Sequence, residues 1–119
     1  MRERSADYLP DLMRGNTETL LLSLIDTLGR AYGYQIIKEI EKKSGGFFLF
    51  KEGTVYPALR KLEREGLLQG EWHEVSNHQE RRYYRVTEKG KAELSRKLAV
   101  WESFTLAMNL VFRPVNSST

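Results

Sequence analysis

Helical periodicity in three successive segments, followed by one switch to strand-like alternation, is the feature that most constrains the fold of this chain. Apolar residues recur at helical spacing in residues 20–28, in residues 36–40 and again in residues 55–62. Each of these segments is followed by flexible residues that are typical of helix ends. The three stop signals are Gly29, residues 44–46 and Gly66. The pattern therefore predicts three short helices, of which the third spans residues 52–65.

In the second half of the chain, the spacing of apolar residues changes from that of helices to that of strands. Residues 67–75 and 81–87 have the composition of two strands, and the polar residues 76–80 between them predict a hairpin turn. A long helix is then expected from residue 88 to about residue 112, with Thr87 as its N-terminal cap. Three helices and a hairpin in this order indicate the winged variant of helix-turn-helix.

The predicted fold class is thus mostly α with a β-hairpin wing, a winged helix-turn-helix plus a long C-terminal helix. We expect residues 1–87 to form the winged domain with an N-terminal extension, and residues 88–119 to form a dimerisation helix and tail. Thr17 is the expected cap of the first helix. The apolar connector at residues 47–50 is expected to pack against the core.

Composition narrows the class of protein. A chain of 119 residues with 40% hydrophobic and 29% charged residues is long enough for one modest core. It has no cysteine, which excludes disulfides and cysteine-based metal sites. No apolar run reaches the roughly 18–20 residues of a membrane span, and residues 1–7 lack a signal-like apolar core. We therefore expect a cytoplasmic protein without membrane contact, and the net charge of +3 hints at a polyanionic partner.

The third predicted helix has two unlike sides. Val55, Leu59 and Leu62 share one side and can anchor the helix to the core. The opposite side is small at its N-terminal end and basic further along. Its members are Gly53, Thr54, Pro57, Arg60, Lys61 and Arg64. A helix that reads bases in the major groove needs this arrangement; the alternative is a solvated face whose cations pair with Glu63 and Glu65.

Two residues of this helix leave alternatives open. Pro57 lies in the first turn if Thr54 is the N-cap, whereas an earlier helix start would place a bend at Pro57. Tyr56 lies at the edge of the apolar side, so its ring can pack while its hydroxyl reaches a phosphate or a neighbouring side chain.

The hairpin carries a second group of cations. Alternation places Arg81, Tyr83 and Arg85 on one face of the strand, and Arg82, Tyr84 and Val86 on the other. Together with His78 at the tip, these arginines form a basic end suited to the sugar-phosphate backbone or the minor groove. In the alternative, the arginines pair with Glu71 and Glu74 of the partner strand. Trp72 is expected to pack as core beneath the hairpin.

Metal and catalytic sites are not expected. The two histidines, His73 and His78, both lie on the hairpin, and no carboxylate cluster has the spacing of metal ligands. Without cysteine, a glycine-rich phosphate loop or a nucleophile–base pair, the sequence predicts no enzyme and no cofactor.

The last helix carries an apolar stripe at the 4-3-4-3-4 spacing of a helix–helix seam. Its members are Leu94, Leu98, Trp101, Thr105, Met108 and Phe112. A second copy of the chain is the natural partner for this stripe, so we expect a homodimer, with an apolar N-terminal patch at Tyr8, Leu9, Leu12 and Met13 packing on the same helix. Packing of the stripe onto the first helix of the same chain is the alternative.

These residues resemble the PadR-like family of bacterial transcriptional regulators. The resemblance covers about residues 12–91. It rests on the runs RG (14–15), TLLL (19–22), YGYQI (32–36), EGTVYPAL (52–59), LEREGL (62–67) and RYYRVTEKG (82–90). It implies a homodimeric winged-helix repressor of the smaller subgroup, with one long C-terminal helix per subunit.

By this resemblance, the DNA contacts fall on residues of the second and third helices and of the wing. They are Tyr34, Thr54, Tyr56, Pro57 and Arg60, with Arg82 and nearby wing residues on the DNA backbone. Two positions depart from the family pattern: Lys51 replaces a capping Ser or Asn, and residues 77–80 lack the usual glycine. Some relatives bind flat aromatic drugs between tryptophans of the last helix, and Trp101 matches that position; simple interface packing is the alternative.

The leading hypothesis is a sequence-specific repressor that binds a palindromic operator as a homodimer and is released by a small aromatic effector. In addition to the residues implied by the resemblance, we expect Lys61, Arg64, His78 and Arg81 to contact DNA. The alternative is a winged helix used for protein–protein contact. The charge of the third helix favours DNA, because the centres of protein interfaces are usually depleted of charge.

Overall fold

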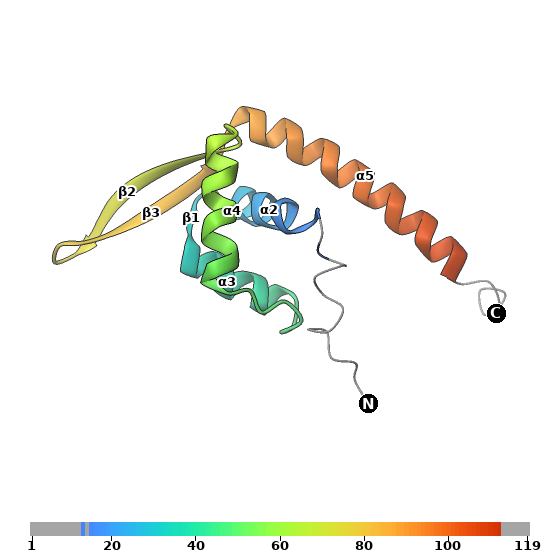
Figure 1. Ribbon diagram of the computed structural model, residues 1–119, viewed down its shortest axis with the longest axis horizontal. Helices are drawn as coiled ribbons and strands as arrows, with labels where there is room; N and C mark the ends of the chain where they lie inside the picture. Colours follow the sequence, from blue (N-terminus) through green and yellow to red (C-terminus); the bar gives the residue numbers. More distant parts are fainter. Residues whose placement is uncertain (1–12, 14, 113–119) are drawn as a thin grey trace.

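A computed structural model describes residue 13 and residues 15–112. Figure 1 shows the helices gathered at the centre, with the hairpin and the last helix projecting in opposite directions. The elements in order are α2 (Thr17–Leu28), β1 (Ala31–Tyr32), α3 (Gly33–Lys43), α4 (Glu52–Arg64), β2 (Leu68–Ser76), β3 (Gln79–Val86) and α5 (Glu88–Phe112). The predicted fold class, mostly α with a β wing and a long C-terminal helix, is confirmed.

The sheet contains one strand that the sequence analysis missed. Residues 31–33 were expected only to lead into a helix, but Ala31 and Tyr32 pair antiparallel with Tyr84 and Tyr83. The resulting sheet has the order β1-β3-β2. A strand of two residues is too short to show alternation, and its partner lies far away in the sequence, so no local pattern indicates it.

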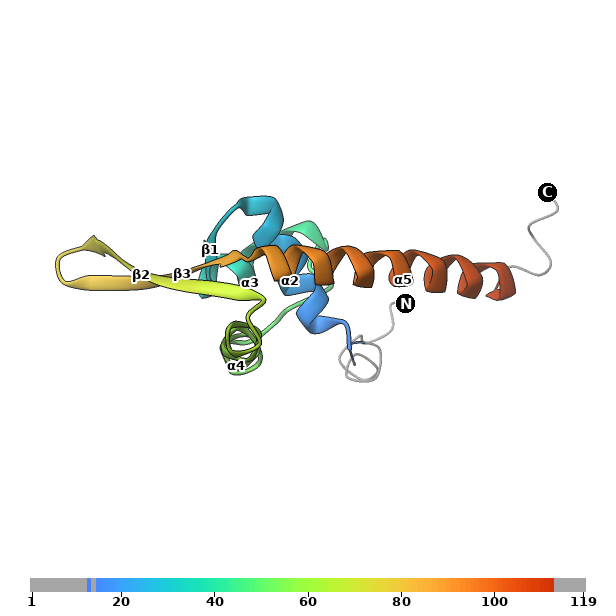
Figure 2. The same cartoon turned by 90° about the horizontal axis from the view of Figure 1, so that it is seen from above.

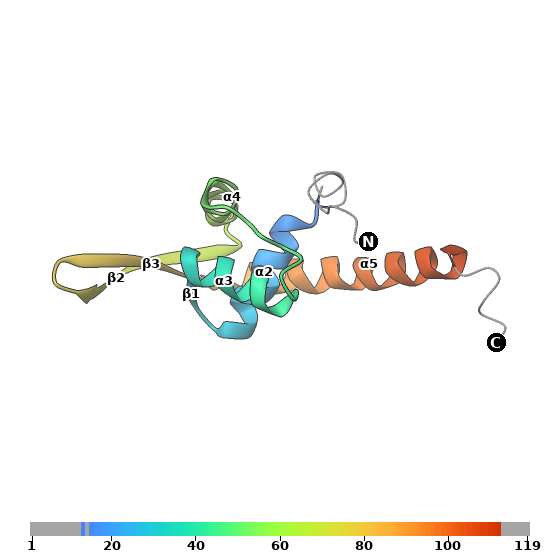
Figure 3. The ribbon, with the colours of Figure 1, turned by 90° about the horizontal axis from the view of Figure 1, so that it is seen from below.

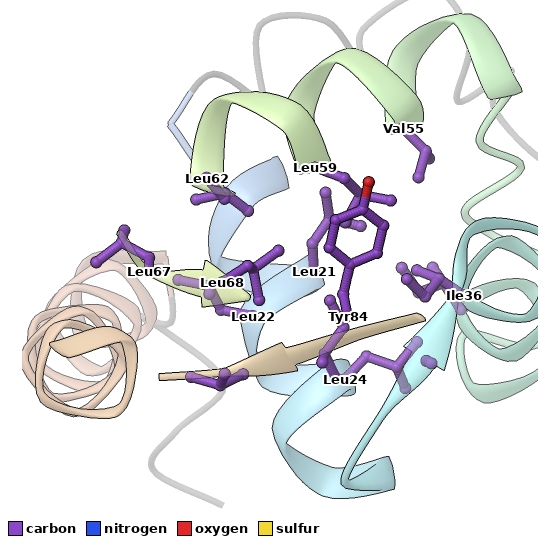
Figure 4. Packing of buried hydrophobic residues seen from close by; sticks show 14 of the residues in the cluster. Leu21, Leu22, Leu24, Ile36, Val55, Leu59, Leu62, Leu67, Leu68 and Tyr84 are labelled. Carbon is purple, nitrogen blue, oxygen red and sulfur yellow. The ribbon is translucent and has the colours of Figure 1, made fainter. Parts of the chain in front are cut away.

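The core lies between α4, α2 and the inner face of the sheet. Figure 4 shows Leu59 and Val55 directed from α4 toward Tyr84 of β3, with Leu21 of α2 beside them. Val55, Leu59 and Leu62 have no exposed surface, which confirms the predicted inner side of this helix. Complete burial of one such aliphatic side chain stabilises a fold by about 1.5–3 kcal/mol. These three residues therefore determine which side of α4 faces the solvent.

The junction between α4, β2 and α5 is tied by hydrogen bonds to Thr87. The backbone N–H of Gly90 donates to the Thr87 Oγ1 at 3.0 Å, and this hydroxyl donates to the carbonyl oxygen of Gly66 at 2.7 Å. Thr87 therefore caps the N-terminus of α5, as the sequence predicts. At the first helix the prediction is off by one residue, because Asn16 is the cap residue of α2 and Thr17 is already helical.

Two expectations about apolar side chains need correction. Trp72 is not core: 62% of its surface is exposed, because it lies on the projecting hairpin (Figure 1), where the Arg82 guanidinium is 5.4 Å from its ring centroid. The connector at residues 47–50 packs only in part. Phe48 and Phe50 lie against the core, whereas Phe47 and Leu49 are exposed, because an extended chain turns alternate side chains away.

The hairpin turn is tighter than expected. The strands leave only residues 77 and 78 between them, where a five-residue turn over 76–80 was predicted. His78 adopts a φ of 60°, so a histidine takes the left-handed conformation that glycine usually supplies. The pairing register shifts between Glu74 and Ser76, which leaves Val75 as an extra residue in β2.

Gly33 is required by a close approach of Tyr56. A Cβ atom at position 33 would lie 1.9 Å from the Cε1 atom of the Tyr56 ring. We expect Gly33→Ala to lower the free energy of unfolding by about 1–3 kcal/mol, as overpacked cores do. Urea unfolding followed by circular dichroism measures this loss. Gly53→Ala is the control: its new Cβ meets no atom within 4 Å, so stability stays equal or rises by up to about 1 kcal/mol.

Candidate nucleic-acid interface

One side of α4 is bare, and we call it the outer face of α4. Its residues are Gly53, Thr54, Pro57, Arg60, Lys61 and Arg64, all of which are exposed. Figures 2 and 3 show α4 end-on, standing to one side of the hairpin and α5. The two-sided character predicted for this helix is therefore present, and its outer face is accessible to a partner.

The N-terminal end of α4 is small and open. Lys51 is the N-cap residue, and its carbonyl oxygen accepts hydrogen bonds from the N–H groups of Thr54 at 2.9 Å and Val55 at 3.0 Å. Because the helix begins at Glu52, Pro57 lies inside it, beyond the first turn, and cannot donate to the carbonyl of Gly53. Gly53 has open space where a side chain would be. A large partner can approach the backbone closely here.

The three cations of the outer face differ in their partners. The Lys61 Nζ lies 2.7 Å from the Glu18 carboxylate of α2 and 3.8 Å from that of Glu65. The hydrogen bond and the charge of Glu18 raise the pKa of the Lys61 ammonium. Within residues 13 and 15–112, the side chains of Arg60 and Arg64 make no ion pair or hydrogen bond. Of the i,i+4 pairs that the alternative predicted, only Lys61 with Glu65 is present, and among the described residues the guanidinium groups of Arg60 and Arg64 stay unpaired.

The two tyrosines that were expected to contact DNA differ in burial. Tyr34, near the start of α3, is about half exposed, and the Lys38 Nζ lies 5.6 Å from its ring centroid. Tyr56 is half-buried against Gly33. Burial, and then the charge of Glu52, raise the pKa of the Tyr56 phenol further above neutral pH, where its hydroxyl can donate a hydrogen bond.

The hairpin arginines follow the predicted alternation. Tyr84 and Val86 are buried, and Arg82 on the same face reaches α4, where its Nη2 donates to the Glu63 Oε2 at 2.5 Å. Burial is the largest single effect and by itself would lower the pKa of the Arg82 guanidinium, but the hydrogen bond and charge of Glu63, together with Tyr84, outweigh it and raise this pKa. Arg81 is exposed on the other face, with its guanidinium 4.2 Å from the Tyr32 ring centroid.

The alternative for the hairpin arginines was pairing with Glu71 and Glu74 of the neighbouring strand. The carboxylate that pairs with Arg82 is instead Glu63 of α4. Glu71 instead contacts the His73 Nε2 at 3.2 Å. His78 is exposed at the tip of the hairpin. Among the described residues, no group of three histidine, cysteine or carboxylate side chains is placed to hold a metal ion.

The predicted stripe of α5 is divided into two parts. Leu94 is only 5% exposed and belongs to the core of its own chain, so it does not belong to the free stripe that was predicted. The reason is that the start of α5 packs on α2, as the intramolecular alternative proposed for the whole helix. Further along, Trp101 is 46% and Phe112 67% exposed. Other apolar side chains exposed on this part of α5 are Leu98, Val100, Phe104, Leu106, Met108, Leu110 and Val111.

A shallow groove of about 500 Å³ lies where α5 leaves the body of the protein. Trp101 and Phe104, with ring centroids 5.9 Å apart, line it together with Val100. Arg96 and Lys97 also line it, and both pair with Glu93. The hydrogen bond from Arg96 lowers the pKa of the Glu93 carboxyl. The predicted N-terminal patch, apart from Met13, lies outside the described residues.

Comparison with known proteins assigns the chain to a family. The model of the transcriptional regulator PadR-like family matches residues 21–96, which include α4 and the whole hairpin. The chain belongs to the PadR-like family. Proteins of the PadR-like family are transcription regulators rather than enzymes, and the chain is a transcriptional regulator of this family. An uncharacterized protein of Lysinibacillus sphaericus is 36% identical over 91 residues, which are 76% of this chain and 83% of that protein.

Solved structures of PadR-like regulators share the fold. A transcriptional regulator of Clostridium thermocellum is 33% identical, with a TM-score of 0.74 over 89% of this chain and 99% of that one. A PadR family regulator of Eggerthella lenta is 28% identical, with a TM-score of 0.77 over 92% of both chains. Bacillus subtilis PadR, solved in complex with operator DNA, is 30% identical, with a TM-score of 0.63 over 68% of this chain and 46% of that one. In the described part of the chain, no helix is long and apolar enough to cross a membrane.

Proposed function

We propose that this PadR-like regulator binds duplex DNA through the outer face of α4. The observation that carries the proposal is that Arg60 and Arg64 are exposed and unpaired among the described residues, beyond the small, open N-terminal end of the same helix. A helix with this profile can place its first turn close to base edges, while its guanidinium groups reach guanine or phosphate. The operator complex of Bacillus subtilis PadR supports DNA as the partner.

The proposed contact residues lie on α4, on α3 and on the wing. On the helices they are Tyr34, Thr54, Tyr56, Pro57, Arg60, Lys61 and Arg64. On the wing they are His78 at the tip and Arg81 of β3, both of which are exposed. Lys61 would exchange its bond to Glu18 for a phosphate. A protein–protein role for the same face remains the competing function, and it predicts weak duplex binding without sequence preference.

We further propose that the chain acts as a homodimer through residues 88–119. The free part of α5 presents a run of apolar side chains that are exposed in the described part of the chain. A second α5 would cover Leu98, Trp101, Thr105, Met108 and Phe112. A two-fold dimer presents two α4 helices to successive major grooves, about 34 Å apart, on a palindromic operator. Such a dimer would repress by occupying promoter DNA.

An aromatic effector is proposed at Trp101. The groove beside this residue offers two aromatic rings together with Arg96, Lys97 and Glu93, so a flat molecule that carries a charge has both stacking and ionic partners there.

The first test is Arg60→Ala. Loss of a bidentate guanidinium contact should cost about 1–3 kcal/mol of binding free energy and relax the preference at one base position. Gel shifts with a duplex selected by the wild-type protein from a random pool measure both effects. Arg96→Ala on α5 is the control, because it removes the same charge away from α4, and affinity should change little. Absence of duplex binding by the wild-type protein at low salt would falsify the proposed function.

The second test concerns the dimer. Met108→Asp puts a charge into the exposed stripe of α5 and should shift the protein from dimer to monomer, because a buried unpaired charge is costly. Sedimentation equilibrium measures this shift. Ser103→Asp adds the same charge on the opposite side of the helix and should leave the dimer intact. A monomeric wild-type protein, or equal behaviour of the two variants, contradicts the proposed seam.

The third test concerns the effector. In a Trp72→Phe variant, Trp101 is the only tryptophan of the chain. A planar organic cation or a phenolic carboxylate that stacks on Trp101 should quench its fluorescence in a saturable manner and release DNA at the same concentration. Unchanged emission with both ligand classes argues against the aromatic site.

A further inference from the structure

Arg82 is held between the hairpin and α4. Its Nη2 donates to the Glu63 Oε2 at 2.5 Å, and the two side chains are only 28% and 30% exposed. The guanidinium lies 5.4 Å from the Trp72 ring centroid and 5.7 Å from that of Tyr84. Arg82 therefore contacts two aromatic rings of the sheet and one carboxylate of the helix.

Gly70 of β2 leaves room for the guanidinium of Arg82. A Cβ atom on Gly70 would come within 2.8 Å of the Cζ, Nε and Nη2 atoms of Arg82, so the guanidinium packs directly over the backbone of β2. Gly70 and Trp72 face Tyr84 and Arg82 across the β2–β3 pair. The absence of a side chain at position 70 thus permits the bond to Glu63.

This ion pair connects the two parts of the proposed DNA interface. Within residues 13 and 15–112, it is the one side-chain ion pair between α4 and the hairpin; Lys61 of α4 pairs with α2 instead. Glu63 belongs to the last turn of α4, whereas Arg82 lies in β3, between the tip of the hairpin and the core. The pair therefore holds the base of the projecting hairpin against the end of the helix.

We propose that Arg82 is a positioning residue that fixes the angle of the wing to α4 through Glu63, rather than a phosphate contact. The inference rests on the proposed function. A helix in the major groove and a wing on the neighbouring backbone must both match the duplex. Fixing their relative orientation in the free protein removes part of the ordering cost of binding. A phosphate would compete with the carboxylate of Glu63 for the Nη2 group of Arg82.

The two roles of Arg82 predict opposite effects of Glu63→Gln. If Arg82 contacts phosphate, this variant frees the guanidinium and removes a negative charge near DNA, so binding tightens and its salt dependence steepens. If Arg82 positions the wing, the same variant weakens binding. We expect the affinity for DNA to fall about tenfold, which is typical of the coupling between two residues of one ion pair. The slope of log affinity against log salt also becomes shallower, because the wing loses phosphate contacts.

Glu65→Gln is the matched control, since it removes the same charge two residues away from the partner of Arg82. This variant should bind as tightly as the wild-type protein or more tightly. Gly70→Ala provides a second probe, because its new methyl group displaces the guanidinium without changing any charge. It should reproduce the loss of Glu63→Gln, and the two losses combined should be less than additive.

Affinities are measured by fluorescence anisotropy on the duplex selected by the wild-type protein and on an unrelated duplex, at several salt concentrations. Circular dichroism first establishes that each variant is folded at the assay temperature. Loss of affinity for the selected duplex with a shallower salt slope supports the positioning role; a loss of stability alone would change neither the slope nor the ratio between the two duplexes. Equal or tighter binding by Glu63→Gln, relative to Glu65→Gln, overturns it. A wild-type protein that binds neither duplex instead overturns the proposed function.

Discussion

The complete burial of one side of α4 is the constraint on which the rest of this structure depends. Val55, Leu59 and Leu62 have no exposed surface and pack against α2 and the inner face of the sheet. Rotation of the helix about its axis would expose these side chains, at a cost of about 1.5–3 kcal/mol for each. Arg60 and Arg64 consequently face the solvent, because the spacing of the apolar residues leaves them no other direction.

The remaining elements hold α4 in place and join it to the hairpin and to α5. Thr87 joins the end of α4 to the start of α5 through its bonds to Gly66 and Gly90. Arg82 joins the hairpin to α4 through Glu63. The free part of α5 extends away from these contacts with its apolar side chains exposed (Figure 1). In the proposed dimer, the separation of the two α4 helices would therefore be set by the pairing of α5 with its copy.

Periodicity predicted much of this architecture. The inner side of α4, the cap at Thr87, the length of α5 and the alternation in β3 all follow from patterns within a few residues. The features that were missed depend on residues distant in sequence, such as β1 with β3 or Lys61 with Glu18. Trp72 was misplaced for a similar reason. Its apolar character indicated burial, but most of its surface stays exposed on the projecting hairpin, beside the guanidinium of Arg82.

The proposed function requires that the outer face of α4 enters a groove of the DNA. An NMR titration of the labelled protein with a selected duplex tests this most directly. If this face enters a groove, the largest amide shifts occur at the start of α4, at Gly53 and Thr54, and continue to Arg60 and Arg64. The exposed residues Lys42 and Lys43 at the end of α3 should change little. Shifts confined to other surfaces, with the amides of α4 unchanged at saturating duplex, would contradict the account.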